Sequence, residues 1–156
     1  MANTDVTLDN ARKDVLSNQE RAQGYTHKYT IKYTDIDEGG GSTDTVTVAL
    51  GNTPTDFVIS KAMLNVTTAF TGTGAMTVQV GTDGDPNNFI AAITALTAGP
   101  TISAAGAAPV TLAGTFAIAA DALEALFTNS SSGSPSALTA GELDIYLAMH
   151  SANNVG

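Results

Sequence analysis

The sequence predicts an all-β protein, an antiparallel β-sandwich of jelly-roll type with an extended or partly helical N-terminal arm. Three observations predict this class. Apolar and polar residues alternate along several short stretches, which is the pattern of strands that bury one face. Stretches rich in Gly, Asn, Asp and Pro separate them at intervals typical of a sandwich. The strands follow one another without intervening helices, which disfavours a parallel sheet.

The stretch Y-T-H-K-Y-T-I-K-Y-T, residues 25–34, predicts the first strand of the domain. Every second residue is aromatic, histidine or isoleucine, and the residues between them are threonine or lysine. Successive side chains of a strand point to opposite faces, so one aromatic face is expected: Tyr25, His27, Tyr29, Ile31 and Tyr33. We therefore divide the chain into an arm (1–24), a β-sandwich domain (25–150) and a polar tail (151–156).

The arm carries a weak helical stripe. Its members recur at helical spacing, and Thr7 or Asp9 would cap the helix: Leu8, Ala11, Val15, Asn18 and Ala22. A lone helix of this length is marginal in water. Two interpretations follow, a frayed terminus or a segment that orders when it docks on a partner.

Five alternating stretches predict further strands, at 45–50, 57–68, 76–80, 110–118 and 142–150. Their inward residues are Val46, Val48, Leu50, Ala62, Leu64, Val66, Met76, Val78, Val80, Val110, Leu112, Phe116, Ile118, Leu143, Ile145, Leu147 and Met149. In the last stretch the residues predicted to face solvent are Glu142, Asp144, Tyr146, Ala148 and His150. Residues 121–127 are rich in helix formers, but their flanks favour a strand; residues 89–96 fit a strand or one helical turn.

Two loops have sequences that partly match known ligand-binding loops. The glycines of residues 39–42 follow an acidic run and lack the lysine and helix of a phosphate-binding loop, so a flexible connection is the better interpretation. Asp83, Asp85 and Asn87 match the first three positions of a calcium loop. The sixth and twelfth positions carry Asn88 and Thr94 instead of glycine and an acid, so we favour a plain turn over a calcium site.

Composition and charge exclude most chemistries. The formal net charge of −9 disfavours nucleic acid, and no run is long enough to span a membrane. The absence of cysteine removes thiolate and zinc–sulfur chemistry. The two histidines, His27 and His150, lie on different predicted strands, and no Gly-x-Ser-x-Gly motif occurs. We predict a non-enzymatic protein without a cofactor, with no signal peptide at its N-terminus.

Outward positions of the predicted strands are mostly Thr, Ser, Ala or Gly. Long charged side chains normally protect sheet edges from aggregation, and few are present here. A symmetric assembly would cover these weakly protected faces and edges of the sheets. The composition therefore predicts a homo-oligomer, and we favour a trimer.

Three stretches give the chain its resemblance to a family. They are the arm leading into residues 25–34, the region F-V-I-S-K-A-M-L-N-V-T-T-A-F-T-G through M-T-V-Q-V-G-T-D-G-D-P-N-N-F-I, and L-T-A-G-E-L-D-I-Y-L. Together they cover about half of the chain. In these stretches the sequence resembles the jelly-roll cement, or decoration, proteins on the heads of tailed bacteriophages.

The resemblance implies a structural virion protein that binds the outside of the capsid and bridges subunits of the major capsid protein. It implies no catalytic residues. Independently of the resemblance, the absence of cysteine, and hence of disulfides, fits synthesis in the host cytoplasm. Carried onto this sequence, the residues expected to grip the capsid are Arg12, Lys13, Arg21, Tyr25, Lys28, Tyr29, Lys32 and Tyr33. The alternative function is a carbohydrate-binding or adhesin module of a head fibre or tail component, with the loop at Asp83 holding calcium. A small hydrolase is the third hypothesis.

Overall fold

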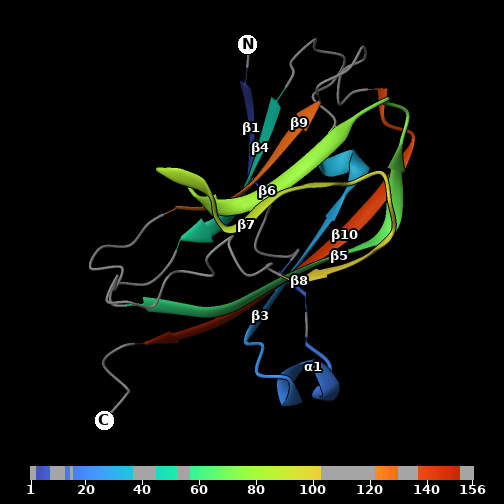
Figure 1. The fold of residues 1–156 in the computed structure, drawn as a ribbon. Coiled ribbons are helices and arrows are strands. Elements are labelled where there is room, and N and C mark those ends of the chain that lie inside the picture. The colour runs from blue at the N-terminus through green and yellow to red at the C-terminus, as the bar shows by residue number, and fades with distance from the viewer. Residues whose placement is uncertain are drawn as a thin grey trace.

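The computed structural model describes residues 3–7, 13–14, 16–36, 45–52, 57–102, 122–129 and 137–151. They form two β-sheets and very little helix (Figure 1). The strands are β1 (Asn3–Thr7), β2 (Lys13–Asp14), β3 (His27–Lys32), β4 (Thr45–Asn52), β5 (Phe57–Thr71), β6 (Met76–Thr82), β7 (Asp85–Thr94), β8 (Gly99–Ile102), β9 (Ala122–Asn129) and β10 (Ala140–Ser151). The helices are α1 (Asn18–Ala22) and the 3-10 turn η2 (Tyr33–Asp35).

The sheet order is that of a jelly roll. One sheet has the order β1-β4-β9-β6-β7 and the other β2-β3-β10-β5-β8. The strands β3 to β10 pair from the outside inwards, as β3·β10, β4·β9, β5·β8 and β6·β7, all antiparallel. This is the pairing of one long hairpin rolled into two facing sheets. The predicted β-sandwich is confirmed, and the pairing order supports its jelly-roll type.

The core lies between the two sheets and is built from the alternating residues that the sequence marks. Val46, Val48 and Val80 are fully buried, as are Leu64 and Leu147. The rings of Phe70 and Phe127, from one sheet and the other, lie 5.8 Å apart between centroids. The strand preference for residues 121–127 is also confirmed, since β9 buries every second residue. The predicted strand at 110–118 and the loop at 39–42 lie outside the described residues.

The predicted arm contributes a strand to each sheet. β1 pairs in parallel with β4, from Asn3 opposite Thr45 to Thr7 opposite Ala49. β2 pairs with β3, and Lys13 lies opposite Tyr29. In the described part of the arm, helix forms at α1, where Ser17 provides the cap instead of the predicted Thr7 or Asp9.

The first domain strand ends earlier than predicted. β3 stops at Lys32, and Tyr33 and Thr34 belong to η2. The Lys32 amide donates to Asp35 Oδ2 at 2.8 Å, which satisfies a backbone group where sheet pairing ends. The side chain of Asp35 therefore terminates the strand, a signal that the alternation of tyrosine and threonine obscures.

Candidate interaction surface

The outer face of the sheet that contains β10 carries a group of interacting apolar and charged side chains. Residues 16–25, here called the strap, lie across this face and include α1. Leu16 and Tyr25 of the strap bury themselves against Tyr146 and Ala148 of β10, and Met63 of β5 packs beside them. The rings of Tyr25 and Tyr146 are 5.5 Å apart. The outer face therefore has a small apolar cluster of its own, separate from the main core.

This cluster corrects two predictions about faces. The predicted solvent-facing residues Tyr146 and Ala148 are 5% and 2% exposed, because the strap covers them. Tyr25 was expected on the same face as Tyr29. It lies instead on the outer face with Tyr146, whereas Tyr29 belongs to the main core, because the regular strand begins only at His27.

Helix α1 is fixed by a capping box. The Ser17 hydroxyl accepts from the Glu20 amide at 3.2 Å, and Glu20 Oε2 accepts from the Ser17 amide at 2.6 Å. These bonds satisfy two of the amides that a helix N-terminus leaves open. The motif S-N-Q-E thus explains why a helix starts here, although none of its five residues is buried.

Lys61 of β5 holds the other end of the strap. Its ammonium group donates to the Gln23 carbonyl oxygen at 2.9 Å and lies 4.4 Å from the centroid of the Tyr25 ring. The first contact satisfies a carbonyl at the helix C-terminus, and the second is a cation–π interaction. The last basic residue of the sequence therefore binds residues that precede it by almost forty positions.

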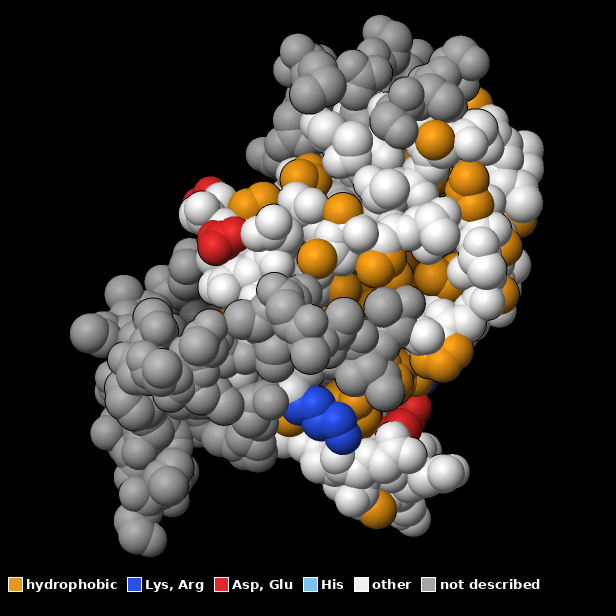
Figure 2. Space-filling model, viewed as in Figure 1, with side chains coloured by type: hydrophobic (Ala, Val, Ile, Leu, Met, Phe, Trp, Pro, Cys, Tyr) orange, Lys and Arg blue, Asp and Glu red, His pale blue; other side chains and the backbone are white. Residues whose placement is uncertain are grey.

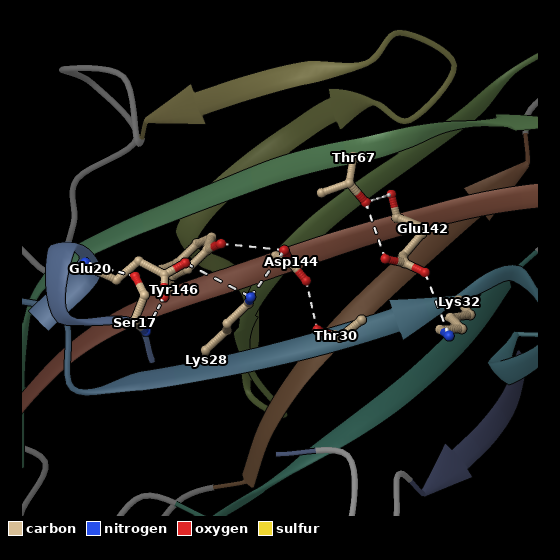
Figure 3. Close-up of polar contacts among 9 residues, drawn as sticks. All are labelled: Ser17, Glu20, Lys28, Thr30, Lys32, Thr67, Glu142, Asp144 and Tyr146. Carbon is tan, nitrogen blue, oxygen red and sulfur yellow. Dashed lines mark hydrogen bonds and ion pairs between the residues drawn. The ribbon is translucent and has the colours of Figure 1, made fainter. Parts of the chain in front are cut away.

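A charged network joins the strap to the sheet beneath it (Figure 3). Lys28 Nζ lies 3.5 Å from Asp144 Oδ2 and 3.8 Å from Glu20 Oε1, so one cation links β3, β10 and α1. The Thr30 hydroxyl donates to Asp144 Oδ1 at 2.6 Å, and the Tyr146 hydroxyl donates to Asp144 Oδ2 at 3.3 Å. Asp144 is thus a paired, nearly buried carboxylate instead of the solvent-facing one predicted.

The ionisation of the network follows from its packing. Burial raises the pKa of the Tyr146 phenol far above its usual value, and the nearby Glu20 and Asp144 carboxylates raise it further. Burial alone would raise the pKa of Glu20. Hydrogen bonds from Ser17 and Tyr146 and the charge of Lys28 outweigh that effect and lower it. At neutral pH the network therefore holds a neutral phenol beside an ionised Glu20.

A second polar group lies further along β10, outside the strap. Lys32 Nζ is 3.7 Å from Glu142 Oε2, and these side chains are 58% and 37% exposed. The Thr67 hydroxyl of β5 donates to the Glu142 carbonyl oxygen at 3.1 Å. This part of the face is open to solvent, and the charged groups of Lys32 and Glu142 are exposed there.

The predicted capsid-gripping residues are thus distributed between the interior and the surface. Tyr25 and Tyr29 are buried, and burial raises the pKa of both phenols. Tyr33 is half-buried against the core, and Lys28 is engaged in the network. Arg21 and Lys32 are the members whose described side chains face solvent. Arg12 and the side chain of Lys13 lie outside what the structure describes.

The candidate calcium loop forms the tip of a hairpin. Asp83 and Gly84 connect β6 to β7, and Asp85 pairs with Thr82. Asp83, Asp85 and Asn87 are exposed, and acidic side chains project at this tip in Figure 2. Among the described residues, no group of three or more His, Cys, Asp or Glu side chains lies close enough to hold a metal ion.

The outer network is what sequence reasoning missed. Glu20, Asp144 and Tyr146 carry it, and the pattern of β10 assigned the last two to solvent. The available signal was the capping sequence S-N-Q-E shortly before β3, which marks a short helix able to fold back on the sheet.

In the described part of the chain, no helix has the length and apolar character needed to cross a membrane.

Comparison with known proteins adds one likeness in structure. The fold places the chain in the class of jelly-roll β-sandwich proteins. No protein-family model matches it, and no curated protein does. A chain in a solved structure, the capsid of Ralstonia phage GP4, is similar over 97% of this chain and 99% of that chain, with a TM-score of 0.50 and 18% identity. At this identity the likeness shows a shared fold.

Proposed function

We propose that this protein is a structural component of a tailed-phage virion that binds the outside of the capsid and bridges its subunits as a cement or decoration protein. The observation that carries the proposal is the match in fold over nearly the whole of both chains to a component of a phage capsid. The match spans the two chains end to end, which suits a protein with the same overall plan. It agrees with the resemblance already noted in residues 25–34 and 57–90.

The surface is compatible with this role. The described outer positions of the β1-containing sheet are largely small or neutral, with Thr45, Thr77 and Thr128 in one row across β4, β6 and β9 and Glu124 as an acidic exception. A net charge of −9 would keep the protein from binding packaged DNA. Under the proposal the protein is made in the host cytoplasm and reaches the capsid exterior by binding the major capsid protein.

Fewer of the predicted capsid-gripping residues are exposed for contact than the sequence suggests. Tyr25 and Tyr29 contribute to the stability of the fold, since both are buried in the single chain. Among the described members of the predicted set, Arg21 of the strap and Lys32 of β3 are exposed to solvent, and Lys32 is paired there with Glu142. We assign them, with Arg12 and Lys13, to the contact with the capsid protein.

Purified protein and purified capsids of the virus that encodes it provide the test. Mixing should give decorated particles in which the protein sediments with the shell, and particles that lack it should release DNA at lower temperature. Arg21→Ala with Lys32→Ala should weaken decoration, whereas Asn52→Ala, an exposed change on the other sheet, should not. Absence of the protein from purified virions would contradict the proposal. Binding to host glycans with calcium dependence would instead favour the adhesin alternative.

A further inference from the structure

The strap cannot hold its place by helix formation alone. α1 has five residues, none of them buried, and isolated helices of this length are unstable in water. Its apolar anchors are Leu16 before the helix and Tyr25 after it. What holds the helix between these anchors is therefore polar, and the described polar contacts converge on few side chains.

Glu20 is the side chain that connects the helix to the sheet. Through its carboxylate it accepts from the Ser17 amide at 2.6 Å and completes the capping box. The same carboxylate lies 3.8 Å from Lys28 Nζ of β3, and the Tyr146 phenol of β10 is among the groups that lower its pKa. One ionisable group therefore serves the helix, β3 and β10 together.

From this geometry we propose that Glu20 is an acid-sensitive latch, which holds the strap over the outer face when ionised and releases it when protonated. Release uncovers Met63, Tyr146 and Ala148, the residues that the strap now covers. A protonated Glu20 loses its attraction to Lys28, whose ammonium stays with Asp144 at 3.5 Å. This inference goes beyond the proposed function and does not depend on it.

The charged and titratable groups around Glu20 agree on the direction. Lys28 from β3 favours the ionised form, as does Tyr146 from β10, which remains a neutral donor. Asp144 from β10 opposes it but is neutralised by Lys28, and Lys61 from β5 contacts Gln23 at the far end of the helix. Because the folded-state pKa of Glu20 is lowered, its stabilisation is present above the ordinary pKa of a glutamate and is lost as pH falls through the folded value.

The test follows two ring pairs by NMR in the full-length protein between pH 7 and pH 3. Tyr25 and Tyr146 report on the strap, and Phe70 and Phe127, at 5.8 Å, report on the core. On acidification the cross-peak between the tyrosine rings should disappear while the phenylalanine cross-peak remains. Persistence of both cross-peaks through the titration would overturn the latch.

Glu20→Gln isolates the charge, because glutamine keeps an oxygen that can accept in the capping box. At pH 7 this variant should already lack the tyrosine cross-peak and retain the phenylalanine one. Glu142→Gln removes an equal charge, paired with Lys32 on the same sheet face but away from α1, and should behave as the unaltered protein. If acid abolishes both cross-peaks together, the whole protein has unfolded. The spectrum of Glu20→Gln at pH 7 then decides whether loss of the charge releases the strap. A Glu20→Gln protein with an intact tyrosine cross-peak, or with the pH response of the parent, refutes the proposal.

Discussion

At the scale of single residues, Gly141 is a position where even one added methyl group would collide with the core. Its φ of +145° lies in the region that favours glycine, and a Cβ there would collide with the ring of the buried Phe70. Gly141→Ala should therefore lower the free energy of unfolding by about 2–4 kcal/mol, through backbone strain and a displaced aromatic ring. Urea denaturation measures the loss.

Gly24→Ala is the matched control for this substitution. Gly24 has a φ of +91°, but a Cβ there would meet nothing within 4 Å. The control should carry only the backbone strain, about 1–2 kcal/mol. Equal losses for the two variants would mean that the contact between Phe70 and Gly141 contributes nothing.

Asp144 and Glu142 are two paired carboxylates on one strand that should differ in their effect. Asp144 is nearly buried and accepts from Thr30 and Tyr146 beside Lys28, whereas Glu142 pairs with Lys32 in solvent. Asp144→Asn places an amide where donors converge, and should cost about 1–3 kcal/mol. Glu142→Gln should cost less than about 1 kcal/mol, because exposed ion pairs contribute little. Equal midpoints in thermal unfolding would contradict this ranking.

Tyr29 tests the inward face of β3. Its side chain is 5% exposed within the main core, so Tyr29→Asp would bury an unpaired charge and should destabilise the fold by several kcal/mol, on the order of the whole stability of a domain. Thr34→Asp, an exposed site on the next turn, is the control. Circular dichroism should show loss of the folded signal only for the first variant. A folded Tyr29→Asp protein with an unchanged melting temperature would refute this assignment.

At the scale of elements, the N-terminal segment adds to the sandwich without being part of its rolled hairpin. Deleting residues 1–12 removes β1, an edge strand in parallel pairing with β4, and should leave cooperative unfolding. Deleting residues 1–24 also removes Leu16, α1 and β2, which uncovers Tyr146 and Ala148. The longer deletion should still fold, since the eight jelly-roll strands remain, but it should bind the dye ANS more strongly than the shorter one.

The comparison of the two deletions has a clear negative outcome. If the 1–24 deletion is unfolded by circular dichroism, the strap is required for folding, and the division of the chain at residue 24 is wrong. If both deletions bind ANS equally, the outer face is not an apolar surface protected by the strap.

The same elements show what sequence predicts well. The inward residues of β4, β6 and β10 were predicted correctly, because alternation marks the two faces of a strand. The face between two sheets is buried, so its side chains have to be apolar. The burial of the outer residues of β10 was mispredicted, because the same alternation was taken to mean that the outer face meets solvent. A second layer over the outer face is not visible in the alternation of one strand, because Tyr146 is amphipathic and Asp144 is polar. Contacts with Tyr25, 121 residues earlier in the chain, and with Lys28 decide the burial of Tyr146 and Asp144.

At the scale of the whole molecule, the largely uncharged outer face of the β1-containing sheet bears on association with further copies of the chain. The proposed trimer predicts a native mass of three 15.8 kDa chains in analytical ultracentrifugation, independent of added metal. A single-chain mass across micromolar concentrations would exclude a stable trimer in solution. It would leave oligomerisation on the capsid, which cross-linking on decorated particles would detect.

The central position of β10 has a consequence for biosynthesis. β10 follows all the other described strands in the chain, yet it lies between β3 and β5 in the middle of its sheet. While a ribosome is still translating residues before 140, β3 and β5 have no strand to join them, and half of the sandwich cannot close. Closure of this sheet therefore waits until β10 has been synthesised, and nascent chains expose open strand edges until β10 emerges from the exit tunnel.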